Sequence, residues 1–314
     1  MQAAPLHVDV ADGPPGGEAW WVMAEDGRRL RIATWPAAED TRPAGTVLIF
    51  PGRTEYAEKY GRAARAYAQA GYAVAAIDWR GQGLSARTAP DPRLGHVENF
   101  AEFQRDVAAL LGLIEARGLP GPRFLVAHSM GGCIGLRALI DGLPVRAVAF
   151  SAPMWGAQVA ARDWPFAVIS ALFGPSLGLG GKLTPRTNLD HPFVEGGFPG
   201  NDLTTDREMW DFVKTQVERY PTLALGGPTL GWAHAALIET TRLARLPAPV
   251  IPALTFLGTN DRIVSPGAIR HRMARWPGGR LEIVADAEHE IVLERPEVRE
   301  SFFTASIELF RRHG

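Results

Sequence analysis

The chain has very little cysteine and no excess of charge of either sign. Cys133 is the one cysteine in 314 residues, which excludes an internal disulfide and a cysteine-based metal cluster. Basic side chains number 33 and acidic ones 34, for a formal net charge of −1, whereas proteins that bind nucleic acid usually carry a basic excess or patch. We therefore expect no nucleic-acid partner, and we expect Cys133 to be buried as a small apolar residue.

Long apolar runs are also missing. The longest apolar stretch near the middle of the chain, residues 165–172, is far shorter than the about 20 residues that a membrane-spanning helix needs. Residues 1–12 lack the basic segment followed by an apolar one that marks a signal peptide. The histidines do not have the spacing of a metal site, so no metal or other cofactor is predicted; they include His96, His128, His191 and His234. These absences favour a soluble, cytoplasmic protein.

What the sequence does contain is a regular alternation of apolar strand-like runs and helical periodicities. Such alternation predicts an α/β fold, with a mostly parallel sheet and helices on both faces. The predicted strands are 28–35, 46–50, 72–77, 123–127, 145–150, 251–257 and 281–284, and the predicted helices are 56–70, 100–117, 131–141, 266–275 and 294–311.

The alternation stops for about ninety residues in the middle of the chain. Residues 154–245 carry Trp155, Trp164, Trp210 and Trp232 among glycine and proline clusters. This stretch is too long to be a loop in a compact domain. We expect it to be an inserted, mainly helical cap on a core formed by residues 1–153 and 246–314.

The most informative local pattern is the apolar run 124–128 that ends at Ser129 and continues as a glycine-led helix. A nucleophilic serine on a sharp strand-to-helix turn needs small residues two places before and after it, because strand and helix approach closely there. Ala127 and Gly131 meet this requirement. The simpler interpretation is a small-residue turn with a helix-capping serine.

Two other residues complete the set that a hydrolytic serine needs. Asp261 follows the strand that ends at residue 257, and His289 follows the last predicted strand. Catalytic groups gather at the carboxyl ends of parallel strands, and the chain order serine, aspartate, histidine is the one expected for this elbow. His289 is predicted to accept the Ser129 proton, and Asp261 to orient the imidazole. Taken singly, Asp261 could be a turn residue and His289 a solvated loop residue.

An oxyanion also needs at least two fixed hydrogen-bond donors. The backbone amide of Met130 is the first candidate, because helix N-termini present free amides. The amide of Arg53, after the strand 46–50, is the second, with Gly52 permitting a tight turn. A plain strand-ending turn is the alternative interpretation of this loop.

Several motifs together resemble one family over nearly the whole chain. They are residues 50–60 (FPGRTEYAEKY), 78–85 (DWRGQGLS), 95–100 (GHVENF) and 127–132 (AHSMGG). The chain resembles an α/β-hydrolase of the bacterial lysophospholipase and monoacylglycerol lipase branch. Residues 225–232 (LGGPTLGW) resemble the lysophospholipase members in particular. One departure is Pro51, which replaces a histidine that many relatives carry before the oxyanion residue.

The resemblance implies a serine esterase that hydrolyses monoacyl lipid esters, either lysophospholipids or monoacylglycerols, to free fatty acid through an acyl-enzyme. The cap would close over the acyl chain. The same three residues would also serve a small-ester carboxylesterase or an amide hydrolase, because the fold does not fix the leaving group. A binding protein on a hydrolase scaffold is a third hypothesis, which the presence of all three residues disfavours.

Substrate contacts are predicted from composition alone. His128 precedes the nucleophile and is expected to line or support the pocket, with Trp155 and Trp232 as further contacts. An apolar wall in the cap is expected from Trp155, Trp164, Phe166, Ile169, Leu172 and Phe173, although aromatic residues at this density often pack the cap onto the core. An exposed 165–173 surface would touch the inner membrane from the cytoplasmic side. Arg53 or Arg80 could meet a phosphate, with a structural role favoured for Arg80.

Overall fold

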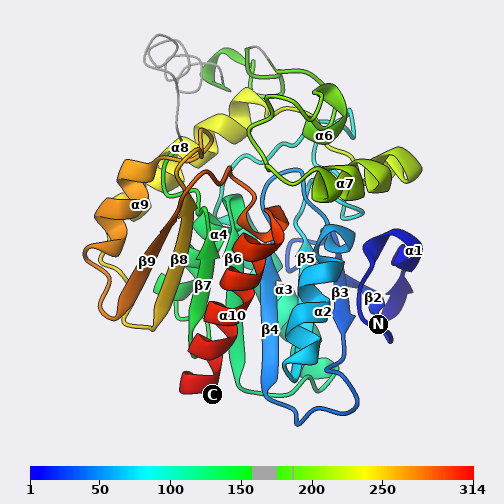
Figure 1. Ribbon diagram of the computed structural model, residues 1–314. Coiled ribbons are helices and arrows are strands. Elements are labelled where there is room, and N and C mark those ends of the chain that lie inside the picture. The colour runs from blue at the N-terminus through cyan, green and yellow to red at the C-terminus, as the bar shows by residue number, and fades with distance from the viewer. Residues whose placement is uncertain (158–174, 186) are drawn as a thin grey trace.

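The computed structural model describes residues 1–157, 175–185 and 187–314 (Figure 1). In these residues a nine-stranded sheet has the order β1-β2-β3-β5-β4-β6-β7-β8-β9. The pairs β1–β2, β2–β3 and β3–β5 are antiparallel, and every later pair is parallel. The strands are β1 (Gln2–Ala4), β2 (Glu18–Met23), β3 (Arg29–Trp35), β4 (Gly45–Phe50), β5 (Tyr72–Asp78), β6 (Arg123–His128), β7 (Val148–Ser151), β8 (Ala253–Gly258) and β9 (Gly279–Val284).

Helices cover both faces of this sheet. The described α-helices are α1 (Val8–Ala11), α2 (Gly61–Gln69), α3 (Glu102–Ala116), α4 (Met130–Ile140), α6 (Pro192–Glu195), α7 (Arg207–Arg219), α8 (Leu230–Ala244), α9 (Pro266–Met273) and α10 (Pro296–His313). Short 3-10 turns are η1 (Ala57–Tyr60), η2 (Pro175–Leu177), η3 (Pro221–Leu223) and η4 (Ile291–Leu293). Helices α2 and α10 lie on one face, and α3 and α4 on the other (Figure 1). The predicted fold class is confirmed.

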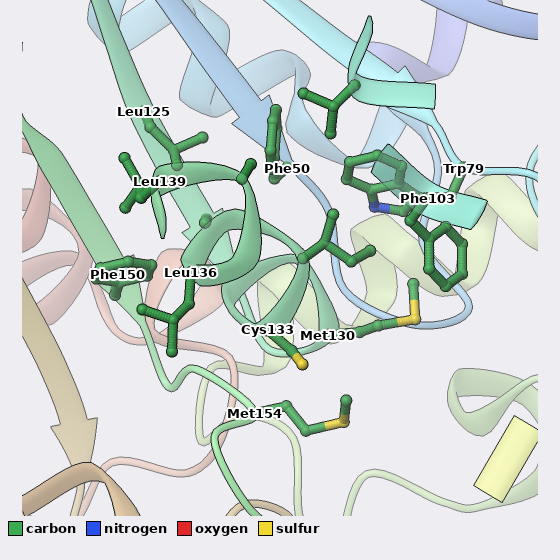
Figure 2. Packing of buried hydrophobic residues seen from close by; sticks show 14 of the residues in the cluster. Phe50, Trp79, Phe103, Leu125, Met130, Cys133, Leu136, Leu139, Phe150 and Met154 are labelled. Atoms are coloured by element: carbon green, nitrogen blue, oxygen red, sulfur yellow. The ribbon is translucent and has the colours of Figure 1, made fainter. Parts of the chain in front are cut away.

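Alternate residues of the central strands serve the two apolar cores. In β4, Leu48 and Phe50 pack with α3 and α4, whereas Val47 and Ile49 pack with α2 and α10. A strand buried on both faces therefore reads as a continuous apolar run in the sequence. Figure 2 shows the first core around α4, where Cys133 lies near Met130 and Met154. Cys133 is fully buried as predicted, and burial raises the pKa of its thiol.

The segment between β7 and β8 contains α6, α7 and α8, which lie above the carboxyl ends of the parallel strands in Figure 1. Capping side chains start two of these helices. Asp206 accepts hydrogen bonds from the first-turn amides of α7, and Thr229 accepts one from Trp232 in α8. The division into a core and a cap at residues 154–245 stays a prediction. Trp164 and the 165–173 surface, with the other wall residues there, lie outside the described residues.

Element boundaries differ from the predicted ones for local reasons. The predicted helix 56–70 begins as the 3-10 turn η1 before α2. Strand β8 begins at Ala253, since Pro252 has no amide hydrogen to donate to a ladder. Strands β1 and β2 were not predicted, because β2 is only partly buried and lacks a clear alternation. No helix in the described part of the chain has both the length and the apolar character that crossing a bilayer requires.

Candidate active site

Ser129 occupies a strained turn between β6 and α4. Its backbone has φ 49° and ψ −118°, in the region that side-chain-bearing residues seldom adopt. The surroundings fix this conformation: the Ser129 amide donates to Ser151 O at 3.1 Å, and the Ser129 carbonyl accepts from Gly132 and Met154, each at 2.8 Å. A Cβ on Gly131 would lie 2.0 Å from the Phe50 carbonyl oxygen. The small residue predicted at position 131 is therefore required for helix and strand to approach.

The structure brings Ser129, His289 and Asp261 together at the carboxyl edge of the sheet. His289 Nε2 lies 2.9 Å from Ser129 Oγ, and His289 Nδ1 lies 2.8 Å from Asp261 Oδ2. All three residues are buried. The other carboxylate oxygen, Asp261 Oδ1, accepts from the amides of Ile263 and Val264 at 2.9 and 3.1 Å. These contacts fix the carboxylate toward the imidazole.

The charge on Asp261 follows from its neighbours. Burial alone would raise the pKa of this carboxyl, but hydrogen bonding to His289 and to the two amides outweighs burial and lowers it. Asp261 therefore stays ionised near neutral pH and holds a proton on His289 Nδ1. In that tautomer His289 Nε2 is free to accept the hydroxyl proton of Ser129. The geometry is that of a serine made nucleophilic by an oriented base.

Residues of the predicted cap region help to hold the histidine loop. The Glu290 amide donates to Leu203 O at 2.8 Å, and the His289 amide donates to Asp202 O at 3.4 Å. Glu294, fully buried, accepts hydrogen bonds from both the amide and the hydroxyl of Thr205. Movement of residues 202–205 would therefore shift the backbone that carries His289.

Of the two predicted oxyanion residues, Met130 follows Ser129 directly, and Arg53 follows Gly52, on which a Cβ would lie 3.0 Å from His128 Cδ2. Met130 is the first residue of α4, and first-turn amides have no partner within a helix. Among the described residues, no group accepts a hydrogen bond from the Arg53 amide. The loop carrying Arg53 is braced although Pro51 replaces the usual histidine: Trp79 Nε1 donates to Pro51 O at 2.9 Å, and Gln82 Nε2 donates to Gly52 O at 2.8 Å.

A buried ionic network, formed by Glu55, Lys59, His128 and Glu290, lies behind these groups. Lys59 Nζ donates to Glu55 Oε1 and, at 2.8 Å, to Glu290 Oε1. His128 Nε2 lies 3.2 Å from Glu290 Oε2 as an ion-pair contact, and its Nδ1 donates to the Ser151 carbonyl at 3.1 Å. Glu55 Oε2 in turn accepts from the Gly52 amide. The network thus joins the oxyanion loop to the residue that follows His289.

Sequence reasoning missed most of this network. It placed His128 beside the pocket, but Glu55 and Lys59, spaced four apart, have the pattern of an exposed helical ion pair. The Lys59 and Glu55 side chains are each only 3% exposed. Glu55, His128 and Glu290 have ligand atoms close enough to hold a metal ion, yet the Lys59 ammonium already lies between the two carboxylates. We assign no metal to this cluster.

Opposite charges outweigh burial inside the network. Burial would raise the pKa of Glu290, but Lys59 and His128 lower it well below its usual value. Burial would likewise lower the pKa of His128, but Glu290 and Glu55 raise it. The His128 and His289 ring centroids are 4.8 Å apart, so the Glu290 carboxylate offsets a positive charge on His128 close to the His289 ring.

Acid should weaken the fold through Glu290. Because its pKa is lower in the folded chain than in the unfolded one, its contribution to stability is full above about pH 4.3 and is lost as the pH falls through the folded-state value. We expect Glu290→Gln to flatten the fall in unfolding free energy between pH 5 and acid, measured by urea unfolding followed by tryptophan fluorescence. Glu218→Gln, at a solvent-exposed glutamate, should keep the wild-type slope. Equal slopes for both variants would contradict this assignment.

Trp155, one of the predicted substrate contacts, packs among other aromatic side chains. Trp155 is buried against Phe150 and stacked on Trp276, and its Nε1 donates to Gly132 O. It also lines a cavity of about 950 Å³ between α8 and α9, whose lining includes none of Ser129, Asp261 and His289. The structure therefore gives Trp155 a packing role, and its predicted contact with substrate stays a prediction.

The structure also shows the neighbours of Trp232, Arg53 and Arg80. Trp232 is partly buried, stacks edge-on with Phe100, and lies under the Arg53 guanidinium, 5.3 Å from its Cζ. Arg80 is bound by the carboxylates of Asp26, Glu102 and Asp106. The structural role favoured for Arg80 is confirmed, which leaves Arg53 as the candidate for a phosphate contact.

Comparisons with known proteins show the family to which the chain belongs. The model of the family described as serine aminopeptidase, S33, matches residues 41–296. Lysophospholipase L2 of Escherichia coli (strain K12) is 30% identical over 290 residues, which cover 85% of this chain and 81% of that protein. The chain belongs to the α/β-hydrolases of the lysophospholipase and monoacylglycerol lipase branch. As a member of this family, it is a carboxylic ester hydrolase.

More distant relatives show the same fold. Monoacylglycerol lipase of Mycolicibacterium smegmatis is 27% identical over 282 residues, covering 85% of this chain and 91% of that protein. A solved structure of a soluble variant of monoglyceride lipase from Saccharomyces cerevisiae superposes with a TM-score of 0.71 at 21% identity, covering 93% of this chain and 94% of that one. The fold of this α/β-hydrolase is therefore shared with lipases well beyond the range of clear sequence similarity.

Proposed function

We propose that this α/β-hydrolase is a serine esterase that releases free fatty acid from monoacyl lipid esters, lysophospholipids or monoacylglycerols, through an acyl-enzyme. One observation carries the proposal: the hydrogen-bonded series Ser129 Oγ, His289 and Asp261 at the carboxyl edge of the sheet. The names of the relatives supply the substrate class, because lysophospholipase L2 and monoacylglycerol lipase each act on a lipid that carries one acyl chain.

The chemistry follows from the three side chains and the two amides. His289 Nε2 takes the Ser129 proton as Oγ bonds to the ester carbonyl carbon, and the carbonyl oxygen gains a negative charge that the Arg53 and Met130 amides stabilise. When the intermediate collapses, the carbon–oxygen bond to the glycerol part breaks and His289 gives its proton to the departing alcohol. Water then attacks the acylated serine by the same route and frees the fatty acid.

The predicted cap region completes the proposed enzyme. Ser129 is only 8% exposed, so a substrate must enter beneath residues that cover the carboxyl edge. We propose that residues 154–245 form this cover over the acyl chain, that the enzyme works in the cytoplasm, and that its contact with a membrane surface is transient. The segment 165–173, proposed for that contact, lies outside the described residues.

Fatty-acid release from a panel of substrates tests the proposal. Purified protein is incubated with a lysophospholipid, a monoacylglycerol, a diacyl phospholipid, a short-chain ester and the amide analogue of that ester. We expect release from the two monoacyl lipids at rates well above those for the diacyl lipid. Turnover of the short ester alone would indicate a carboxylesterase, and turnover of the amide alone would indicate an amide hydrolase. No turnover at all would revive a binding role.

A further inference from the structure

The Arg53 side chain is a cation on the loop whose amide we propose for the oxyanion hole. Its terminal nitrogen Nη2 donates to Gly226 O at 2.7 Å, and its guanidinium lies over the Trp232 ring. Its Nε is buried and has no hydrogen-bond partner. Among the described residues no acidic group pairs with it, and burial lowers the pKa of the Arg53 guanidinium to about 9.

Two other buried arginines of the described residues are neutralised by carboxylates. Arg31 binds both Glu58 and Asp78, and Arg80 binds three carboxylates. Arg272 has no carboxylate partner among the described residues, but it donates to Leu243 O and Leu246 O at or just beyond the C-terminal end of α8, where the carbonyl groups carry partial negative charge. The Arg53 guanidinium, by contrast, contacts one carbonyl oxygen, that of Gly226, and one aromatic ring, that of Trp232. An incompletely paired, partly buried cation is costly to keep, and an anionic ligand would remove that cost.

The length of the side chain suggests which anion fits. Six covalent bonds separate the Arg53 backbone nitrogen from its guanidinium carbon. Six bonds also separate the ester carbonyl carbon of a lysophospholipid from its phosphorus, through the ester oxygen, the three glycerol carbons and the phosphate oxygen. With the carbonyl oxygen on the Arg53 amide, the phosphate can therefore reach the guanidinium of the same residue, at a span of roughly 7 Å.

We propose that the Arg53 guanidinium binds the phosphate of a lysophospholipid head group while the Arg53 amide binds the ester carbonyl oxygen. This inference rests on the proposed function and narrows its substrate class to phosphate-bearing monoacyl lipids. Nε and the remaining amino hydrogens supply the paired donors that arginine offers to phosphate. Gly95 lets the guanidinium pack closely against its loop, since a Cβ at that position would lie 2.8 Å from Arg53 Nη2.

The test compares two lipids with the same acyl chain, a lysophosphatidylcholine and a monoacylglycerol, both below their micelle-forming concentrations. We expect Arg53→Gln to lower the ratio of kcat/KM for the lysophospholipid to that for the monoacylglycerol by roughly 10- to 100-fold. Arg53→Lys, which keeps the charge without the paired donors, should retain part of the preference. Arg87→Gln is the matched control, because Arg87 also donates from a core loop to a carbonyl of the predicted cap, Thr222 O, and should leave the ratio unchanged.

The outcomes separate this inference from the proposed function. Equal loss on both lipids in Arg53→Gln, with the ratio preserved, would make Arg53 a purely structural residue and overturn the inference alone. Inorganic phosphate that inhibits monoacylglycerol hydrolysis only when Arg53 is present, without any change of the lipid ratio in Arg53→Gln, would show a free-phosphate site and also overturn it. A wild-type protein that cleaves neither lipid would remove the proposed function and the inference with it.

Discussion

Ser129→Ala is expected to lower kcat for a monoacyl ester by roughly 10⁴- to 10⁶-fold, with little change in substrate binding. In the proposed mechanism the Ser129 hydroxyl oxygen bonds to the ester carbon, and no other described hydroxyl lies on His289 Nε2. His289→Ala should cost a similar factor, since without the base the serine keeps its proton near neutral pH. Fatty-acid release under saturating substrate measures both effects.

Non-additivity sharpens this expectation. Because the two groups act as one unit, Ser129→Ala combined with His289→Ala should be no slower than either single variant. Ser301→Ala, at an exposed serine of α10, is the control and should retain wild-type kcat. Substantial activity in Ser129→Ala would show that another nucleophile, or water attacking directly, performs the hydrolysis.

Lys59→Met is expected to destabilise the protein by about 3–5 kcal/mol, because it leaves buried carboxylates without their cation. Lys59 Nζ contacts Glu55 and Glu290, and the Lys59 and Glu290 side chains are 3% and 5% exposed. Burial would lower the pKa of Lys59, yet the two carboxylates raise it. Lys59 is therefore present as the charged ammonium. Urea unfolding followed by tryptophan fluorescence measures the loss.

A matched substitution and a double variant make this second expectation specific. Lys214→Met breaks a solvent-exposed pair with Glu218 on α7 and should cost less than about 1 kcal/mol. Adding Glu290→Gln to Lys59→Met should cost less than the sum of the two single changes, because the amide removes one uncompensated charge. Equal destabilisation by Lys59→Met and Lys214→Met would refute a buried, tightly coupled network.

The hydrolase core was predictable because its determinants are local in sequence. Strands such as β4 and β6 are buried on both faces and appear as unbroken apolar runs, and Ser129 sits where such a run meets a glycine-led helix. Asp261 and His289 were found because each follows a strand, and parallel strands end at one edge of the sheet. Chain order and strand position were thus enough to predict that these three residues, far apart in the sequence, lie close together in the fold.

What could not be predicted depends on contacts across the fold. The pairing of Lys59 with Glu290 joins residues more than two hundred positions apart, and no local pattern marks either side chain as buried. Trp155 was predicted as a pocket aromatic from composition, and its stacking on Trp276, which follows β8 in the chain, could not be predicted from its own segment. The partial pairing of Arg53 is likewise visible only once Gly226 and Trp232 are in place.

Partitioning of the acyl group tests the central claim, an acyl-enzyme formed from monoacyl lipids. The protein is given hydroxylamine together with palmitoyl lysophosphatidylcholine or monopalmitoylglycerol, and the ratio of hydroxamate to free palmitate is measured for each lipid. Since both lipids would pass through the same acylated Ser129, we predict one common ratio whatever the leaving group. Ratios that differ between the lipids, or hydrolysis without any hydroxamate, would contradict the acyl-enzyme.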